Sequence, residues 1–179
     1  MIFTETELKG CFVIDPKIYK DDRGVFFESF KKNELEKTLG YKIDFVQENQ
    51  SISRKGVLRG LHFQDGEAAQ AKLVRAIKGK ALDVVVDIRK ASPTYGEHLK
   101  IELSAKSKRA IFIPKGMAHG FLALTKKVVL SYKCDNYYAP EEESGIIYND
   151  SNLNIDWGFS NSNLLLSKKD IALPNFSAL

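Results

Sequence analysis

Two of the three histidines in this chain occur in patterns that suit proton transfer or metal binding. His62 closes a run that begins with Gly56, and His119 closes the run Pro-Lys-Gly-Met-Ala-His that begins at Pro114. An imidazole exchanges its proton near neutral pH and is also a common metal ligand. For one isolated histidine, a hydrogen-bonded place in the core is the simpler interpretation, so the surrounding residues must decide the role.

A metal site is the first alternative to test. The first motif reads His62-Phe63-Gln64, so a glutamine stands where a His-x-His pair would have its second ligand. The third histidine, His98, follows Thr94-Tyr95-Gly96-Glu97 and is expected in a solvent-facing loop. Zinc and iron favour histidine and carboxylate ligands in a compact set. We therefore expect no metal and no cofactor, although a site of two histidines and one carboxylate remains an alternative.

Short alternating runs bounded by turn residues dominate the chain, which is typical of β-strands. The clearest run is Ala81 to Ile88, where one face is apolar and the other carries Asp83 and Asp87. The run Lys72 to Ile77 precedes it, and Lys78-Gly79-Lys80 between them predicts a hairpin turn. Further strands are expected over residues 43–50, 60–64, 99–103, 110–114, 120–124 and 128–134. One helix is expected over residues 32–39, with Gly40 ending it, and a short turn or helix over residues 167–170.

This pattern predicts a mainly β fold, a sandwich or barrel with a few short helices. A length of 179 residues suits a single domain over residues 1–179. The two histidine motifs are similar to those of the cupin jelly roll, a double-sheet β-barrel in which each motif places a histidine at the barrel mouth. The resemblance therefore predicts a cupin-type jelly roll, in which two β-sheets form the barrel.

The bulk composition excludes several classes of function. Two cysteines, Cys11 and Cys134, suit a reducing compartment better than a disulfide framework, and we expect both to be buried thiols. The first residues have no signal-peptide pattern, and no apolar run approaches the roughly 20 residues of a membrane span. We therefore expect a cytoplasmic protein without a membrane partner. The net charge of +4 is spread over scattered basic residues, which favours a small dianionic ligand over nucleic acid.

Several segments along nearly the whole chain resemble the dTDP-4-dehydrorhamnose 3,5-epimerases, in the order that the family has them. They are residues 22–28 (DRGVFFE), 46–51 (VQENQS), 56–64 (GVLRGLHFQ), 69–75 (AQAKLVR), 83–96, 113–121 (IPKGMAHGF), 132–138 (YKCDNYY) and 166–170 (LSKKD). Each segment alone would be weak evidence. Together they identify the chain as similar to cofactor-free epimerases of nucleotide-linked 4-keto-6-deoxy sugars.

The chemistry of such an enzyme is compatible with these residues. In a 4-keto sugar, C3 and C5 both flank the carbonyl, so an enzyme can remove their hydrogens and leave an enolate. Reprotonation from the opposite face inverts the carbon, which requires a base, an acid across the ring and a positive group near the enolate oxygen. No redox cofactor is needed, and the chain has no glycine-rich nucleotide fingerprint.

The resemblance assigns four catalytic residues. It implies His62 as the base, Asp170 as its carboxylate partner, Tyr132 as the acid on the other face and Lys72 as the enolate-stabilising cation. Each has a plainer alternative role. Asp170 lies in a Ser-x-x-Asp run that suits a helix cap, Tyr132 shares its parity with apolar residues of a strand, and Lys72 would otherwise be an exposed lysine beside a turn.

The resemblance also implies the residues that bind the nucleotide-sugar. They are Arg23, Glu28, Gln47, Glu48, Asn49, Arg59, His119, Tyr138, Glu143 and Lys169. Arg23 and Lys169 would neutralise the diphosphate, and Tyr138 would stack on thymine. Arg59 and His62 are three residues apart, so a regular strand would point them to opposite faces, and either a loop or a bulge is required. The family forms homodimers, so Arg23 and Glu28 are candidates to act in the partner's site.

Several rival functions remain open at this stage. A relative that epimerises only C3 would use the same catalytic residues. A 3,4-ketoisomerase has different motifs around the histidines. A metal-dependent cupin oxygenase predicts bound iron, and a non-catalytic sugar-binding cupin predicts affinity without solvent exchange.

Overall fold

The computed structural model describes residues 1–160 and 163–179. Its helices are α1 (Lys32–Leu39) and α2 (Lys168–Ile171), with short 3-10 turns at Gly66–Ala68, Pro140–Glu142 and Phe176–Ala178. Its strands are β1 (Ile2–Glu5), β2 (Phe12–Asp15), β3 (Ile18–Asp21), β4 (Gly24–Phe27), β5 (Gln47–Arg54), β6 (Leu58–Gln64), β7 (Lys72–Lys78), β8 (Lys80–Asp87), β9 (His98–Ser104), β10 (Ala110–Ile113), β11 (Met117–Ala123), β12 (Lys127–Cys134) and β13 (Glu143–Gly145). The mainly β prediction is confirmed.

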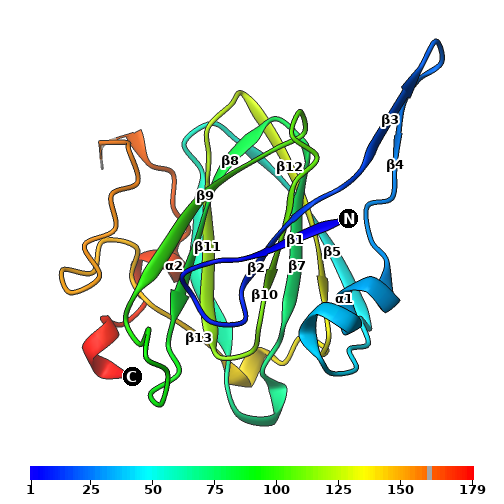
Figure 1. The fold of residues 1–179 in the computed structure, drawn as a ribbon. Coiled ribbons are helices and arrows are strands. Elements are labelled where there is room, and N and C mark those ends of the chain that lie inside the picture. The colour runs from blue at the N-terminus through cyan, green and yellow to red at the C-terminus, as the bar shows by residue number, and fades with distance from the viewer. Residues whose placement is uncertain (161–162) are drawn as a thin grey trace.

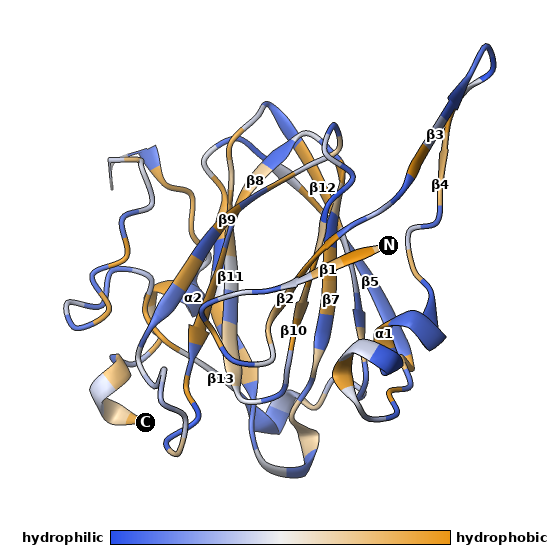
Figure 2. Ribbon diagram, in the orientation of Figure 1, coloured by the Kyte–Doolittle hydropathy of each residue, from blue (hydrophilic) through white to orange (hydrophobic). Residues whose placement is uncertain are grey.

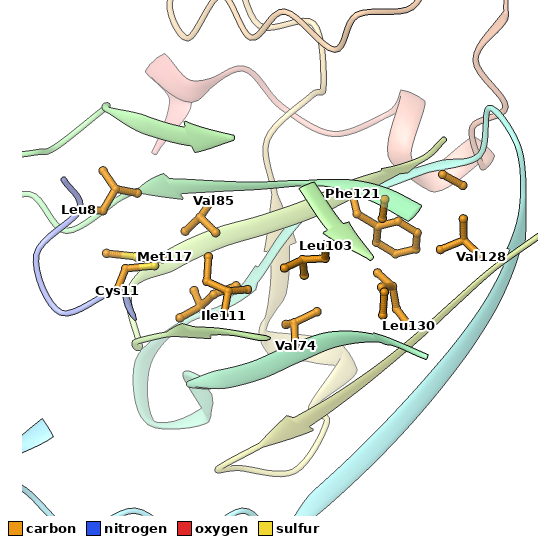
Figure 3. Packing of buried hydrophobic residues seen from close by; sticks show 14 residues of the cluster. Leu8, Cys11, Val74, Val85, Leu103, Ile111, Met117, Phe121, Val128 and Leu130 are labelled. Atoms are coloured by element: carbon orange, nitrogen blue, oxygen red, sulfur yellow. The ribbon is translucent and has the colours of Figure 1, made fainter. Parts of the chain in front are cut away.

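Two antiparallel sheets face each other to form the barrel (Figure 1). One has six strands in the order β1-β2-β10-β7-β12-β5, and the other has five in the order β13-β6-β11-β8-β9. Strands β3 and β4 pair only with each other and form an arm that projects away from the barrel (Figure 1). The core between the sheets consists of inward side chains from both, including Val74, Val85, Ile111 and Leu130 (Figure 3).

The five-stranded sheet is buried on both faces. Its outer face carries Val84, Val86 and Leu122, which pack against Trp157 and Leu164 of the C-terminal segment. Apolar residues therefore occur on both parities of β8, and Figure 2 shows apolar and polar segments alternating along the barrel strands. The inner face of β8 is therefore shielded from water. A charged residue on that face needs a hydrogen-bond or ion-pair partner, because an unpaired buried charge is costly.

The hairpin predicted at Lys78-Gly79-Lys80 is wrong. This turn joins β7 to β8, which belong to different sheets and do not pair with each other. The inner side chains of the two strands, Ala76 and Ala81 among them, face the same core from opposite sides, which requires a corner between the sheets. Gly79 fits the corner because its φ is +75° and a Cβ there would lie 2.3 Å from the Lys127 carbonyl oxygen.

Two further predictions need correction. The strand expected over residues 43–50 is β5, Gln47–Arg54, because its pairing runs from Gln47 opposite Cys134 to Arg54 opposite Lys127. Ile43 instead packs beneath α1 in a third apolar cluster. His98 is not in a loop: it begins β9 opposite Val86 and is half-buried, and burial lowers its pKa.

The remaining predicted elements are confirmed with small shifts at their ends. Helix α1 spans the predicted residues, and its chain reverses at Gly40, whose φ of +78° is left-handed. Strands β1 to β4 and β13 were not predicted. Cys11 and Cys134 are both free and buried, as expected.

Candidate active site

The two motif histidines lie side by side on neighbouring strands. His62 on β6 is paired directly with His119 on β11, and both side chains line a cavity of about 320 Å³. Asp170, on α2, lies against the His62 ring and lines the cavity, and Asp83, on β8, lies against the His119 ring, so each histidine has a carboxylate partner.

The first pair joins His62 to the C-terminal helix. The His62 Nε2 lies 2.6 Å from Asp170 Oδ1, and the Ser167 hydroxyl donates to Asp170 Oδ2 at 2.8 Å. Burial opposes ionisation, but the hydrogen bonds from His62 and Ser167 outweigh it and hold the pKa of Asp170 below its usual range. Ser167 also caps α2 by accepting from the Asp170 backbone N–H. The helix cap in the Ser-x-x-Asp run and the predicted contact between Asp170 and His62 are therefore both present.

The second pair joins His119 to Asp83 on β8. The His119 Nε2 lies 3.0 Å from each carboxylate oxygen of Asp83, which is fully buried. Asp83 was not among the site residues predicted from the sequence, and it reaches the cavity only through its contact with His119. The alternation along β8 could have indicated that Asp83 is buried. Asp83 points to the same face as Ala81 and Val85, which are core residues between the sheets.

A bulge in β6 resolves the position of Arg59. Along β11 the partners step from His119 to Phe121, while along β6 they step from His62 to Arg59, so β6 has one extra residue. Arg59 and His62 therefore both line the cavity. Gly60 occupies the bulge with a φ of +118°, and a Cβ there would lie 2.6 Å from the Gly120 Cα. Of the two explanations left open by the sequence, the bulge is the one observed.

The opposite wall comes from the six-stranded sheet. Tyr132 on β12 and Lys72 on β7 line the same cavity as His62. Burial raises the pKa of Tyr132, so the phenol keeps its proton at neutral pH. Burial lowers the pKa of Lys72, and within the described residues its ammonium group has no hydrogen-bond or ion-pair partner. Lys72 is thus available to an oxygen of a bound molecule.

A smaller pocket of about 100 Å³ adjoins the cavity and shares His62, Lys72 and Tyr132 with it. Gln47, Asn49, Tyr138 and Glu143 line this pocket, and Lys169 lines the larger cavity. The Glu143 carboxylate accepts hydrogen bonds from Lys169 and from the Tyr138 hydroxyl. Burial would raise the pKa of Glu143, but these two bonds outweigh it and lower the pKa.

Three predicted binding residues lie outside both pockets. Arg23 is at the tip of the β3–β4 arm, where it pairs with Asp21 and its side chain is 90% exposed. Glu28 lies at the base of the arm and pairs with Lys31. Glu48 points to the outer face of β5, because its neighbours Gln47 and Asn49 point inward, and it bonds Ser131 and Lys133. The strand period of two therefore separates Glu48 from the residues beside it.

Among residues 1–160 and 163–179, no three or more His, Cys, Asp or Glu side chains gather closely enough to hold a metal ion. The described helices are also all too short or too polar to cross a membrane.

Comparison with known proteins identifies the family. The model of the dTDP-4-dehydrorhamnose 3,5-epimerase family matches residues 5–178. The chain is 48% identical to the enzyme of that name from Salmonella typhimurium, over 97% of this chain and 94% of the relative. The chain belongs to the dTDP-4-dehydrorhamnose 3,5-epimerase family. The enzyme class and the activity predicted from the sequence are thereby confirmed.

Solved structures agree with this family assignment. The crystal structure of the epimerase from Elizabethkingia anophelis superposes with a TM-score of 0.97 at 44% identity, covering 99% of this chain and 97% of that one. The epimerase from Legionella pneumophila, in complex with dTDP-4-keto-L-rhamnose, superposes with a TM-score of 0.94 at 44% identity, covering 99% and 94%. The cupin-type jelly roll of this epimerase is shared with both.

Proposed function

We propose that this epimerase inverts C3 and C5 of dTDP-4-dehydro-6-deoxy-D-glucose, with His62 as the base and Tyr132 as the acid. The observation that carries the proposal is that these two side chains come from opposite sheets and line one cavity. A sugar ring between them would have one proton-transfer group on each face. This is the arrangement that inversion requires, because the proton must return on the side opposite its removal.

Each remaining group has one task in the proposed mechanism. Asp170 fixes the His62 ring and stabilises the imidazolium that forms when the proton arrives. Lys72 stabilises the negative charge that develops on the C4 oxygen. Tyr132 then gives its proton to the far face of the enolate carbon. The same cycle acts at C3 and at C5, since both carbons are adjacent to the carbonyl.

The charge of Lys72 gives the reaction an alkaline limit. A lysine is cationic below its pKa, and burial lowers this pKa, so the stabilising charge is lost at a lower pH than for an ordinary lysine near about 10.4. We expect kcat/KM to fall as the pH rises through this lowered value. Lys72→Arg should move the decline to higher pH, because guanidinium stays charged. An unchanged alkaline limb in the pH profile of Lys72→Arg would contradict the assignment.

We propose that the nucleotide lies over the adjoining pocket. Tyr138 is exposed and its backbone N–H donates to Gln47, so its ring is held at the rim where a thymine can stack. Lys169 and Arg59 supply positive charge for the diphosphate, and Gln47, Asn49, Glu143 and His119 supply polar contacts. Glu48, on the outer face of β5, is not part of this proposal.

We further propose that the enzyme is a homodimer in the cytoplasm. The β3–β4 arm extends away from its own barrel and exposes Val25 and Phe26, which suits contact with a second subunit (Figure 1). Arg23 and Glu28 on this arm would then complete the partner's site. Two free buried thiols suit a reducing compartment.

Deuterium uptake from heavy water tests the proposed function. Chelator-treated protein is incubated with dTDP-4-keto-6-deoxyglucose in deuterated water, and the product is read by mass and by NMR. We expect label at both C3 and C5, because both carbons lose a proton to His62 and regain one from solvent-exchanged groups. Label at C3 alone would instead identify a C3-only epimerase. Loss of exchange after chelation, restored by iron, would support the metal-dependent cupin alternative.

A further inference from the structure

The cavity contains one buried polar atom that the mechanism does not use. Ser51, on β5, lines the cavity together with His62 and Tyr132, and its hydroxyl oxygen is buried. Among buried side-chain oxygen and nitrogen atoms of the described residues, it is the one without a hydrogen-bond partner. A buried hydroxyl without a partner is costly and uncommon in folded proteins, so its position inside a ligand cavity points to a contact with the ligand.

Its neighbours on the same strand already have partners. The Ser53 hydroxyl, two residues further along β5, accepts a hydrogen bond from the Arg59 Nε at 3.2 Å. On the other side, the Asn49 amide donates to the Cys134 sulfur at 3.9 Å. Three polar side chains thus follow one another on the inner face of β5, and the middle one, Ser51, is the one whose polar group has no hydrogen-bond partner among the described residues.

The part of the cavity wall next to Ser51 includes apolar side chains. Ser51 pairs with Leu130 across the strands, and Leu130 and Phe121 both line the cavity and belong to the core cluster (Figure 3). Asn49 pairs with Tyr132 in the same register, so Ser51 lies one inward-facing position beyond the proposed acid. A hydrogen bond made there is shielded from water and therefore selective for a group that can form it.

We propose that Ser51 binds the C2 hydroxyl of the sugar and holds the ring while its neighbouring carbons invert. This inference rests on the proposed function. A 4-keto-6-deoxyhexose has free hydroxyls only at C2 and C3, because C4 is the carbonyl, C6 is a methyl group and C1 bears the diphosphate. The C3 hydroxyl changes position when C3 inverts. C2 is not adjacent to the carbonyl, so its hydroxyl keeps its configuration and can keep one hydrogen bond throughout both inversions.

A double comparison of enzyme and substrate tests this contact. Wild type and Ser51→Ala are each assayed with the dTDP-linked 4-keto-6-deoxyglucose and with its 2-deoxy analogue, by the deuterium uptake described above. We expect wild type to favour the 2-hydroxy substrate by about 5- to 10-fold in kcat/KM, the usual effect of one neutral hydrogen bond. Ser51→Ala should lose about the same factor with the 2-hydroxy substrate and nothing with the analogue, so that the preference disappears.

Ser53→Ala is the matched control, because its hydroxyl is already bonded to Arg59. It should change the rates with both substrates by a similar factor and leave the preference for the 2-hydroxy sugar in place. An equal loss in Ser51→Ala with both substrates, or no loss with either, would overturn the proposal. Failure of the proposed function itself would look different, since wild type would then exchange no hydrogen in either sugar.

Discussion

Replacing His62 by alanine is expected to abolish hydrogen exchange at both C3 and C5. A positioned general base contributes roughly 10² to 10⁴ in rate, and here one imidazole serves both carbons, so both exchange rates should fall by about 10³ or more. Affinity for dTDP should be largely kept, because the proposed nucleotide contacts are made by other residues, Tyr138 and Gln47 in the adjoining pocket and Lys169 and Arg59 in the cavity. Deuterium uptake at each carbon and calorimetric titration with dTDP measure the two quantities separately.

The variant His62→Asn controls for damage to the fold. Alanine removes the His62 partner of the Asp170 carboxylate, which is 4% exposed, and a buried charge that loses a partner destabilises a protein. Asparagine keeps a hydrogen-bond donor for Asp170 but cannot accept a proton at neutral pH. Both variants should be equally inactive, while His62→Asn should unfold closer to the wild-type temperature.

His119 and its carboxylate partner are the alternative to His62 as the base. His119 lies beside His62 and is bonded to the buried Asp83, so it is a second candidate base in the same cavity. If His62→Ala still exchanged hydrogen at one carbon, that carbon would be assigned to His119. A complete loss at both carbons assigns both steps to His62 and leaves His119 as a binding residue.

Replacing Tyr132 by phenylalanine is expected to separate exchange from inversion. Without the phenol, no acid on the far face can deliver a proton, so product formation should fall by roughly 10² to 10³. His62 can still remove a proton and return a deuteron to the same face, which labels the substrate without inverting it. Labelled starting sugar should therefore accumulate in deuterated water.

The ratio of label in recovered substrate to label in product measures this separation. Phenylalanine keeps the ring in place, and the lost group is a hydroxyl whose pKa is raised by burial. Asn49→Ala is a useful companion, since it removes the polar side chain that pairs with Tyr132 across the strands and leaves the acid itself. It should slow product formation less than Tyr132→Phe. Equal and mild losses of exchange and of product in Tyr132→Phe would argue against Tyr132 as the acid.

Much of this site could be anticipated from local patterns. The alternation along residues 128–134 set Tyr132 on the same strand face as core residues, and the structure places that face inside the cavity. The Ser-x-x-Asp run predicted the turn around Asp170, and the cap is present in α2. Such features depend on neighbours within a few residues, so the sequence contains the information directly.

Other features depend on which strands face one another. The pairing of Asp83 with His119 joins β8 to β11, and the pairing of Asp170 with His62 joins residues 108 positions apart. The turn at Gly79 has hairpin residues but connects two sheets, because the strands beside it must cover a core rather than pair. The residues near each position do not show which strand or residue it will pair with. That pairing is decided when the two strands are buried together in the core.

The sequence by itself determined the β-rich class, the residues able to transfer protons and the family to which they belong. The tertiary structure decided which of them share a cavity. Arg59 and His62 face the same side because β6 has one extra residue at Gly60, while Glu48 is turned away from Gln47 and Asn49 because β5 is regular. Side-chain direction in a strand is set by backbone register, and register is fixed only when the strands pair and the core closes.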